Sequence, residues 1–383
     1  RMQTISGIHY NFSLSEAAWP LLQGADERDG PARAYRDDAY FGLIRNFRRH
    51  SWLLLYLFGA SPAVCASFVA GRPHPLQELK PGTLYLPNST SLRMGPLGYQ
   101  SDAQASLAVS YNCLESYARS LYSALTEPYP QYAAIGITDG TDYRQLATTL
   151  LQIENEFYGT IRPKRRIRPG ERPLHALSER GVEYVEVRCM DLDPFCPVGI
   201  TGATMRFLDV FLLHCLLTGS APDTPEEIAA NSRNLHRVAL RGREPDLRLD
   251  RRGEEITPAE WGRELLGECA AVAAALDSAQ QGSAHRDALS AAAAAIANPS
   301  TTPSARVLRE MEQSHERSHV RFGLAQSVRH RSLLMKLPWA TAADARYVRM
   351  AADSLAAQRK IEAADAVPFE TYRQQYLALE LLS

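Results

Sequence analysis

Two charged side chains that could act on a phosphate lie two residues apart near the middle of the sequence. Residues 181–191 alternate as a β-strand does, so Tyr184, Glu186, Arg188 and Met190 share one face. A Glu carboxylate can hold a hard divalent cation, and an Arg guanidinium can bind two phosphate oxygens at once. The pair therefore suits metal-assisted phosphoryl transfer. An ordinary ion pair on a sheet surface is the alternative.

A second strand-like segment, residues 2–12, opens the sequence with one polar face. Gln3, His9 and Asn11 lie on that face, which is polar enough to line a cavity. His9 could bind a metal ion or a phosphate. A hydrogen-bonded structural histidine is the alternative for this single residue.

Other polar groups stand in loops and at the ends of predicted strands, where small ligands often bind. Asn155 and Tyr158 precede a basic run over residues 162–168, and Arg93 and Tyr99 lie in a loop rich in Pro and Gly. Arg93 could bind a carboxylate. For each group, a solvated loop is the alternative. The basic run lacks the interleaved aromatic residues of a platform for single-stranded nucleic acid.

Hydrophobic periodicity and turn residues predict the elements that must position these groups. They indicate helices over residues 37–58 and 106–125, and strands over residues 132–137 and 144–153 joined by a turn at Asp139-Gly140. Residues 71–102 should contain little regular structure. We therefore expect an α+β fold, with a sheet-containing part over residues 1–200 and a helical part over residues 201–383 that packs on it.

Composition narrows the class of partner and the cellular compartment. The 383 residues include 42 basic and 43 acidic side chains, so no excess of positive charge favours a nucleic acid, and none is expected as a partner. Six widely spaced cysteines without a CxxC pair fit a reduced protein of the cytoplasm. No charge falls between Ser51 and Gly71, but Ser61-Pro62 interrupts this stretch. We expect a buried helix and a packed loop there, and no membrane contact.

Several strings of residues, taken together in their order and spacing, resemble the proteobacterial glutamate–cysteine ligases. They are Met2–Ser13, Tyr56–Ala63, Thr90–Arg93 with Leu97–Tyr99, Leu151–Glu156 with Tyr158 and Ile161–Arg165, and Glu183–Arg188. The resemblance is strong over residues 1–240 and continues more weakly through the helical part.

The resemblance implies a fold related to glutamine synthetase, in which a curved antiparallel sheet forms an open half-barrel with helices outside it. It also implies a reaction. Members of the family use ATP and Mg²⁺ to phosphorylate the γ-carboxylate of glutamate, and the amine of cysteine then displaces the phosphate. The product is γ-glutamylcysteine, the precursor of glutathione.

Family positions also imply roles for the residues named above. By resemblance, Glu186 is a magnesium ligand, Arg188 is a catalytic residue that contacts the transferring phosphate of ATP, and His9 contacts the ATP phosphates. The residues that match positions around the amino-acid substrates are Arg93, Tyr99, Asn155, Tyr158 and Gln3, the last of which lines the cysteine pocket.

The sequence departs from the family at its start. Family members carry a long N-terminal segment with a Glu-x-Glu pair, and one matched carboxylate, Glu186, cannot neutralise several divalent ions beside a triphosphate. We therefore expect part of a longer ligase, with an incomplete sheet, that is inactive alone or depends on a complementing fragment, and that is a monomer when complete. Two alternatives stay open: a related ligase that joins glutamate to another amine, and a noncatalytic protein that binds amino acids or glutathione.

Overall fold

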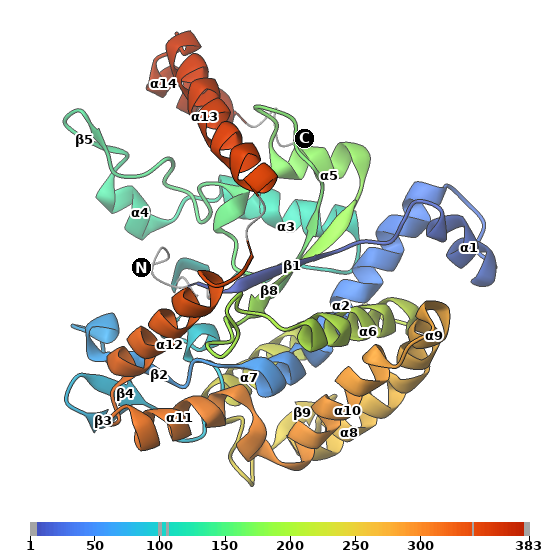
Figure 1. Ribbon diagram of the computed structural model, residues 1–383. Helices are drawn as coiled ribbons and strands as arrows, with labels where there is room; N and C mark the ends of the chain where they lie inside the picture. The colour runs from blue at the N-terminus through green and yellow to red at the C-terminus, as the bar shows by residue number, and fades with distance from the viewer. Residues whose placement is uncertain (1–5, 99–101, 105–106, 339–340, 379–383) are drawn as a thin grey trace.

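The computed structural model describes residues 6–98, 102–104, 107–338 and 341–378. An antiparallel sheet crosses the middle of the molecule, with β8 (Tyr184–Met190) between β1 (Ile8–Phe12) and β7 (Ile161–Lys164) (Figure 1). Val187 is fully buried on one face of β8, whereas the neighbouring Glu186 points to the other face and is partly exposed. This alternation is the period of two that the sequence predicts for a strand.

A long helix, α2 (Ala32–Phe58), forms the centre of the hydrophobic core. Its large apolar side chains, such as Tyr40 and Phe47, have no exposed surface. The helix packs against β7 and β8, and also against α6 (Gly202–Leu217) and α7 (Pro225–Arg241). It therefore connects the sheet that carries the charged residues to the helices that follow it in the chain.

The other helices of the first 334 residues surround this centre. They are α1 (Ala18–Ala25), α3 (Leu114–Thr126), α4 (Pro130–Ile135), α5 (Pro173–Arg180), α8 (Pro258–Glu268), α9 (Ala270–Gln280), α10 (Ala284–Ala297), α11 (Pro303–Ser314) and α12 (His319–Leu334). One hydrophobic cluster contains Val187, Phe207 and Trp261. Residues from both sides of position 200 therefore share one core.

Short strands and 3-10 turns connect these helices. The strand β4 (Thr83–Tyr85) pairs with β2 (Ala63–Cys65) and β3 (Gln77–Lys80), and two hairpins are formed by β5 (Thr138–Asp139) with β6 (Asp142–Tyr143) and by β9 (Leu249–Arg251) with β10 (Glu254–Ile256). The 3-10 turns are η2 (Ala66–Val69), η3 (Leu92–Met94), η4 (Asp102–Gln104), η5 (Glu154–Glu156) and η6 (Pro299–Thr301). Of these segments, β2, η2 and η3 contribute to the cavity described below.

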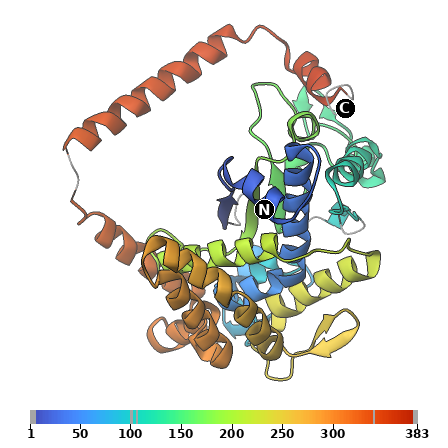
Figure 2. The same ribbon diagram turned by 90° about the vertical axis from the view of Figure 1, so that its right-hand side faces the viewer.

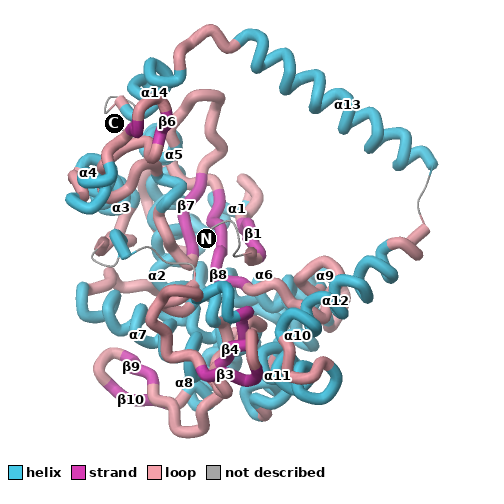
Figure 3. Tube along the Cα trace, turned by 90° about the vertical axis from the view of Figure 1, so that its left-hand side faces the viewer, coloured by secondary structure: helices cyan, strands magenta, loops and turns pink. Residues whose placement is uncertain are grey.

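The C-terminal helices extend away from the rest of the fold and then contact it again (Figures 2 and 3). Figures 2 and 3 show α13 (Thr341–Ala364) extending away from the rest of the molecule, and its side chains from Asp344 onward are exposed. The next helix, α14 (Phe369–Leu377), lies beside the β5–β6 hairpin, where the Tyr143 hydroxyl donates to Glu370 Oε2 at 2.9 Å. The last described helix is therefore bound to residues of the first half of the chain.

Most of the predicted elements are confirmed, and the differences have local causes. The strand over residues 181–191, the long helix and the helical character after residue 204 are present, as is the described part of the first strand. Residues 132–137 were wrongly predicted as a strand, because Pro130 begins α4, where a proline is favourable. The helix predicted from residue 106 begins at Leu114, because Cys113 caps it.

Two further differences between the predicted and the observed elements concern short strands. The prediction of little regular structure over residues 71–102 missed β3 and β4, and residues 144–153 contain only an isolated bridge at Thr149. A hairpin turn was predicted at Asp139-Gly140 and forms one residue later, at Gly140-Thr141, between strands of two residues each. Among the described helices, none has the length and apolar character needed to cross a membrane.

Candidate active site

The pairing of β1 with β8 contains an irregularity next to the charged residues. The register shifts between Ile8 and Tyr10, so that His9 stands opposite two residues of β8, Arg188 and Cys189. A bulge of this kind twists a strand locally and changes the direction of its side chains. It brings the imidazole of His9 and the guanidinium of Arg188 together, with His9 Nε2 3.5 Å from Arg188 Nε.

Glu186 lies at the centre of a cluster of basic groups. Its Oε1 is 3.4 Å from His9 Nδ1, and its Oε2 is 3.4 Å from Lys164 Nζ and 3.6 Å from Arg188 Nε. Because Lys164 belongs to β7, all three strands of the sheet contribute. The side chains of Glu186 and Arg188 are only 14% and 9% exposed, so they do not form an ordinary surface ion pair.

Burial alters the acid–base properties of two members of this cluster. The pKa of the His9 imidazole is lowered mainly by burial and further by Arg188, Arg93 and Lys164, while the charge of Glu186 opposes the change. The pKa of the Lys164 ammonium is also lowered by burial, again against the charge of Glu186. The contacts of His9 fit a ring whose proton on Nδ1 faces Glu186, while Nε2 accepts from Arg188.

Arg93 reaches the end of β8 beside this cluster. Its Nε donates to Asp191 Oδ1 at 2.7 Å, and its Nη2 donates to the carbonyl oxygens of Met190 at 2.7 Å and Arg188 at 3.2 Å. Gly7 lies directly against the guanidinium, since a Cβ at Gly7 would stand 2.6 Å from Arg93 Cζ. The position of Arg93 is thus fixed by β8 on one side and by the chain leading into β1 on the other.

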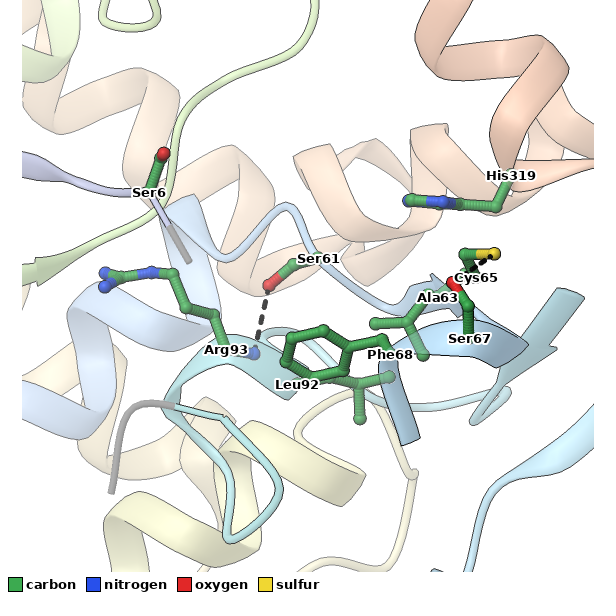
Figure 4. A pocket seen from close by; sticks show the side chains of 10 residues that line it. Ser6, Ser61, Ala63, Cys65, Ser67, Phe68, Leu92, Arg93 and His319 are labelled. Atoms are coloured by element: carbon green, nitrogen blue, oxygen red, sulfur yellow. Dashed lines mark hydrogen bonds between the residues drawn. The ribbon is translucent and has the colours of Figure 1, made fainter. Parts of the chain in front are cut away.

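Arg93 lines a cavity of about 560 Å³. Figure 4 shows it with Ser6 and Ser61 in one part of the cavity, while Cys65 and His319 lie together in another part. Apolar side chains surround these polar groups, as is usual where a few polar groups orient a small ligand. They belong to Ala63, Val64, Phe68 and Leu92.

The loop that contains Asn155 and Tyr158 also reaches Arg188. Phe157, between them, accepts a hydrogen bond from Arg188 Nη1 through its carbonyl oxygen at 3.5 Å. Asn155 is exposed and Tyr158 is half-buried, and neither lines the cavity that contains Arg93. Gln3 and Tyr99 lie outside the described residues, so their positions remain predictions.

Glu154, in the same loop, has a structural role. Arg172 donates from Nε and Nη2 to Glu154 Oε2 at 2.9 and 2.7 Å, and the two side chains are only 1% and 6% exposed. Arg172 Nη1 also donates to the carbonyl oxygen of Tyr376 in α14 at 2.7 Å. This buried ion pair fixes the start of the loop and attaches the C-terminal helix to it.

Three further residues, Lys164, Ser61 and Asp191, belong to the site but were not predicted from the sequence. Lys164 and Ser61 stand in strings that carry the family resemblance, and Asp191 directly follows the strand with the charged pair. Their contacts join distant segments, as in the Arg93–Asp191 pair, whose members are 98 residues apart. Local patterns in the sequence do not show such contacts.

The arrangement as a whole suits an anionic ligand with several oxygens. Lys164, Arg188 and Arg93 provide N–H donors that bind phosphate and carboxylate groups well. Glu186 is a hard oxygen donor among them, of the type that divalent cations prefer. The geometry therefore brings together groups for a phosphate, a metal ion and a carboxylate.

Comparison with known proteins gives consistent matches. Residues 1–238 match the protein family described as glutamate–cysteine ligase. Proteins named glutamate–cysteine ligase from Pseudomonas putida (strain W619) and Pseudomonas aeruginosa (strain LESB58) are each 48% identical over 377 residues. These alignments cover 98% of this chain and 72% and 71% of the two relatives, respectively.

Two solved structures have a similar fold. One is the 2.0 Å crystal structure of the glutamate–cysteine ligase of Francisella tularensis in complex with AMP, with a TM-score of 0.89 and 34% sequence identity. The match covers 98% of this chain and 73% of the Francisella chain. The other is a bifunctional glutathione synthetase from Pasteurella multocida, with a TM-score of 0.64. This match covers 87% of this chain and 37% of the Pasteurella chain. At 24% identity, this second match bears on the fold alone. The similarity thus extends through the helical part of the chain.

Proposed function

The chain belongs to the glutamate–cysteine ligase family, and we propose that it makes γ-glutamylcysteine from glutamate, cysteine and ATP in the first step of glutathione biosynthesis. In this reaction, an oxygen of the glutamate γ-carboxylate attacks the γ-phosphorus of ATP, and ADP leaves. The amine of cysteine then attacks the carbonyl carbon of γ-glutamyl phosphate and loses a proton, and inorganic phosphate leaves.

One observation supports this proposal: Arg93, the group for a carboxylate, contacts β8, which itself carries Arg188, the group for a phosphate. Arg93 lines the cavity and donates to the carbonyl oxygen of Arg188, whose own side chain lies in the Glu186 cluster. An amino acid with one carboxylate bound at Arg93 can present a second carboxylate at Arg188. Such proximity of the reacting groups is what phosphoryl transfer to a carboxylate requires.

In this proposal the basic residues stabilise the charge on the transferring phosphoryl group. Arg188 contacts that group directly and is the catalytic residue, while His9 and Lys164 bind neighbouring phosphate oxygens of ATP. The N–H donors are held in place before the reaction begins, so they need little rearrangement as negative charge develops.

Glu186 is the residue that would hold Mg²⁺. In proteins this ion is commonly bound by one or two carboxylates together with phosphate oxygens of the substrate, and the single carboxylate of Glu186 fits that pattern. When bound, the ion would neutralise charge on the phosphates. The groups that now face Glu186, Lys164 and Arg188, would then bind phosphate oxygens.

The remaining residues of the family motifs are proposed as substrate contacts. Asn155 and Tyr158 are supported by the contact between their loop and Arg188. Gln3, at the cysteine pocket, and Tyr99 are proposed from the family resemblance. We also propose a cytoplasmic location, because the six cysteines are all unpaired, as expected in a reducing compartment. From the family resemblance we propose a monomer that acts on small molecules.

An assay with the purified protein, ATP, Mg²⁺, glutamate and cysteine tests the proposal. We expect γ-glutamylcysteine and ADP in equal amounts when the protein is assayed together with the complementing fragment that the sequence leads us to expect, and no ADP when glutamate is omitted. Robust turnover by the purified protein alone would overturn the expectation that it needs such a fragment. Binding of glutamate without ADP formation would favour a noncatalytic amino-acid-binding protein. Equal turnover with 2-aminobutyrate or a simple amine in place of cysteine would favour a ligase for another amine.

Replacing Glu186 should weaken the use of magnesium. Glu186→Gln removes the charged oxygen donor, so the Mg²⁺ concentration for half-maximal activity should rise on the order of tenfold or more. The measurement is a Mg²⁺ titration at saturating ATP. Glu183→Gln is the control, because Glu183 pairs with Arg166 and Arg165 away from the cluster. An unchanged Mg²⁺ requirement in Glu186→Gln would show that this carboxylate is not a metal ligand.

A methyl group at Gly7 should displace Arg93. In Gly7→Ala the new Cβ would lie 2.6 Å from Arg93 Cζ and 2.8 Å from the carbonyl oxygen of Met190, so either the guanidinium or β1 must move. We expect the KM for glutamate to rise about tenfold, as for the loss of a hydrogen bond to a charged group. Gly24→Ala is the control, since nothing lies within 4 Å of a Cβ there. Equal KM values in both variants would contradict the placement of Arg93.

A further inference from the structure

We propose that Asp191 is a positioning residue for the ligase reaction, which holds Arg93 and Ser61 in the orientation that binds the amino-acid substrate. This inference rests on the proposed function, because it takes Arg93 as the group that binds a substrate carboxylate. Asp191 directly follows β8, and its side chain is only 3% exposed. It acts through its neighbours and does not itself line the cavity.

The Asp191 carboxylate accepts hydrogen bonds from four donors. Oδ1 accepts from Arg93 Nε at 2.7 Å and from Ser91 Oγ at 3.0 Å. Oδ2 accepts from Ser61 Oγ at 2.7 Å and from the backbone N–H of Ala60 at 2.9 Å. One buried carboxylate therefore joins the end of β8 to the loop after α2 and to the turn η3.

These contacts determine which part of Arg93 remains for a ligand. Arg93 Nε donates to Asp191, and Nη2 donates to the carbonyl oxygens of Arg188 and Met190. Nη1 donates no hydrogen bond to any residue in the described part of the chain, and Arg93 lines the cavity. The guanidinium is thus held through two of its nitrogens, and Nη1, which lies beside Gly7, is left to donate to a ligand.

The same carboxylate also directs the hydroxyl proton of Ser61. A carboxylate only accepts hydrogen bonds, so both Ser61 and Ser91 must point their protons at Asp191. The Ser61 oxygen, which lines the cavity, accepts from the backbone N–H of Arg93 at 3.4 Å and keeps its second lone pair as an acceptor (Figure 4). The cavity therefore presents a fixed donor at Arg93 and a fixed acceptor at Ser61, which match the carboxylate and the ammonium of an amino acid.

The loops around Asp191 have backbone support of their own. Leu92 N–H donates to the carbonyl oxygen of Ser61 at 2.8 Å, and Ser61 N–H donates to that of Thr90 at 3.3 Å. Loss of the carboxylate should therefore disturb the orientation of the Arg93 and Ser61 side chains more than the backbone of their loops. This makes a substitution at Asp191 informative about positioning.

Asp191→Asn is the test variant, because it keeps the size of the side chain and converts one acceptor atom into an N–H donor. That donor must face either Arg93 and Ser91 or Ser61 and Ala60, which are donors themselves. We expect the Kd of glutamate, measured by calorimetry, and the KM for glutamate to rise about tenfold or more. The kcat and the Kd of ATP should change by less than a factor of about three, because Asp191 contacts neither ATP nor the transferring phosphate.

The matched control is Asp223→Asn. Asp223 is also 3% exposed and also pairs with an arginine, Arg48, at 3.0 Å, but it does not line the cavity. It should leave glutamate binding unchanged. If Asp191→Asn binds glutamate as well as the wild type while Arg93→Ala does not, the positioning role of Asp191 is wrong and the proposed function stands. If Arg93→Ala also binds glutamate normally, the role of Arg93 in the proposed function is wrong.

A measurement on the wild-type protein decides the question if Asp191→Asn does not fold. The Nε–H of Arg93, assigned by its absence in Arg93→Lys, should give a slowly exchanging NMR signal before glutamate is added. This result supports an arginine that is positioned in advance. An Nε–H that exchanges as fast as that of an exposed arginine in the free protein overturns the proposal.

Discussion

Arg188→Ala should lower kcat by about 10²-fold or more, with much smaller changes in the KM for ATP and for glutamate. The reason is that the Arg188 guanidinium is held in place by its neighbours and is proposed to act on charge that develops only during phosphoryl transfer. It lies 3.6 Å from Glu186 and donates to the carbonyl oxygen of Phe157. Steady-state kinetics with ATP and glutamate varied separately provide the measurement.

The control for Arg188→Ala is Arg166→Ala. Arg166 pairs with Glu183, one residue before β8, but its side chain is 88% exposed and lies outside the cluster around Glu186. That variant should retain wild-type kinetics. If Arg188→Ala also retained kcat, or raised only KM, Arg188 would be part of an ion pair or a binding contact and not a catalytic residue.

Arg172→Ala should lower the free energy of unfolding by about 3–5 kcal/mol, the usual cost of leaving one partner of a buried ion pair without the other. Glu154 would keep its buried charge, and Tyr376 in α14 would lose both a hydrogen bond and the guanidinium that lies 4.8 Å from its ring. Equilibrium unfolding in urea, followed by circular dichroism, measures the effect.

Two further variants test the explanation for Arg172→Ala. Arg166→Ala removes an exposed ion pair and should change the unfolding free energy little. The double variant Glu154→Leu/Arg172→Met removes both charges and should be more stable than Arg172→Ala, because no unpaired charge remains buried. A double variant that is less stable than Arg172→Ala would contradict this explanation.

The sequence predicts the strand that carries the site because a period of two is a local property. The alternation over residues 181–191 places Glu186 and Arg188 on one face, and the structure shows them 3.6 Å apart. The bulge opposite His9 was not predictable in the same way, because it depends on how β1 pairs with β8. These strands are far apart in the sequence, with 179 residues between the positions of His9 and Arg188. Family motifs supplied His9 as a candidate where local pattern left it open.

Other features depended on partners that the sequence does not show. Arg93 was a candidate from its type and its motif, but its orientation is set by Asp191, Met190 and Gly7 from two other segments. Glu154 stands in a string that carries the family resemblance, yet its contacts with Arg172 are structural. In both cases the difference between a ligand contact and a structural contact is decided by tertiary packing.

The proposed function depends on one step, the transfer of the γ-phosphoryl group of ATP to the γ-carboxylate of glutamate. The most direct measurement follows ¹⁸O from labelled glutamate γ-carboxylate during turnover with cysteine. We expect one labelled oxygen in each inorganic phosphate, because the carboxylate oxygen that attacks phosphorus leaves with it. Formation of γ-glutamylcysteine with unlabelled phosphate, or with the label in AMP, would contradict it.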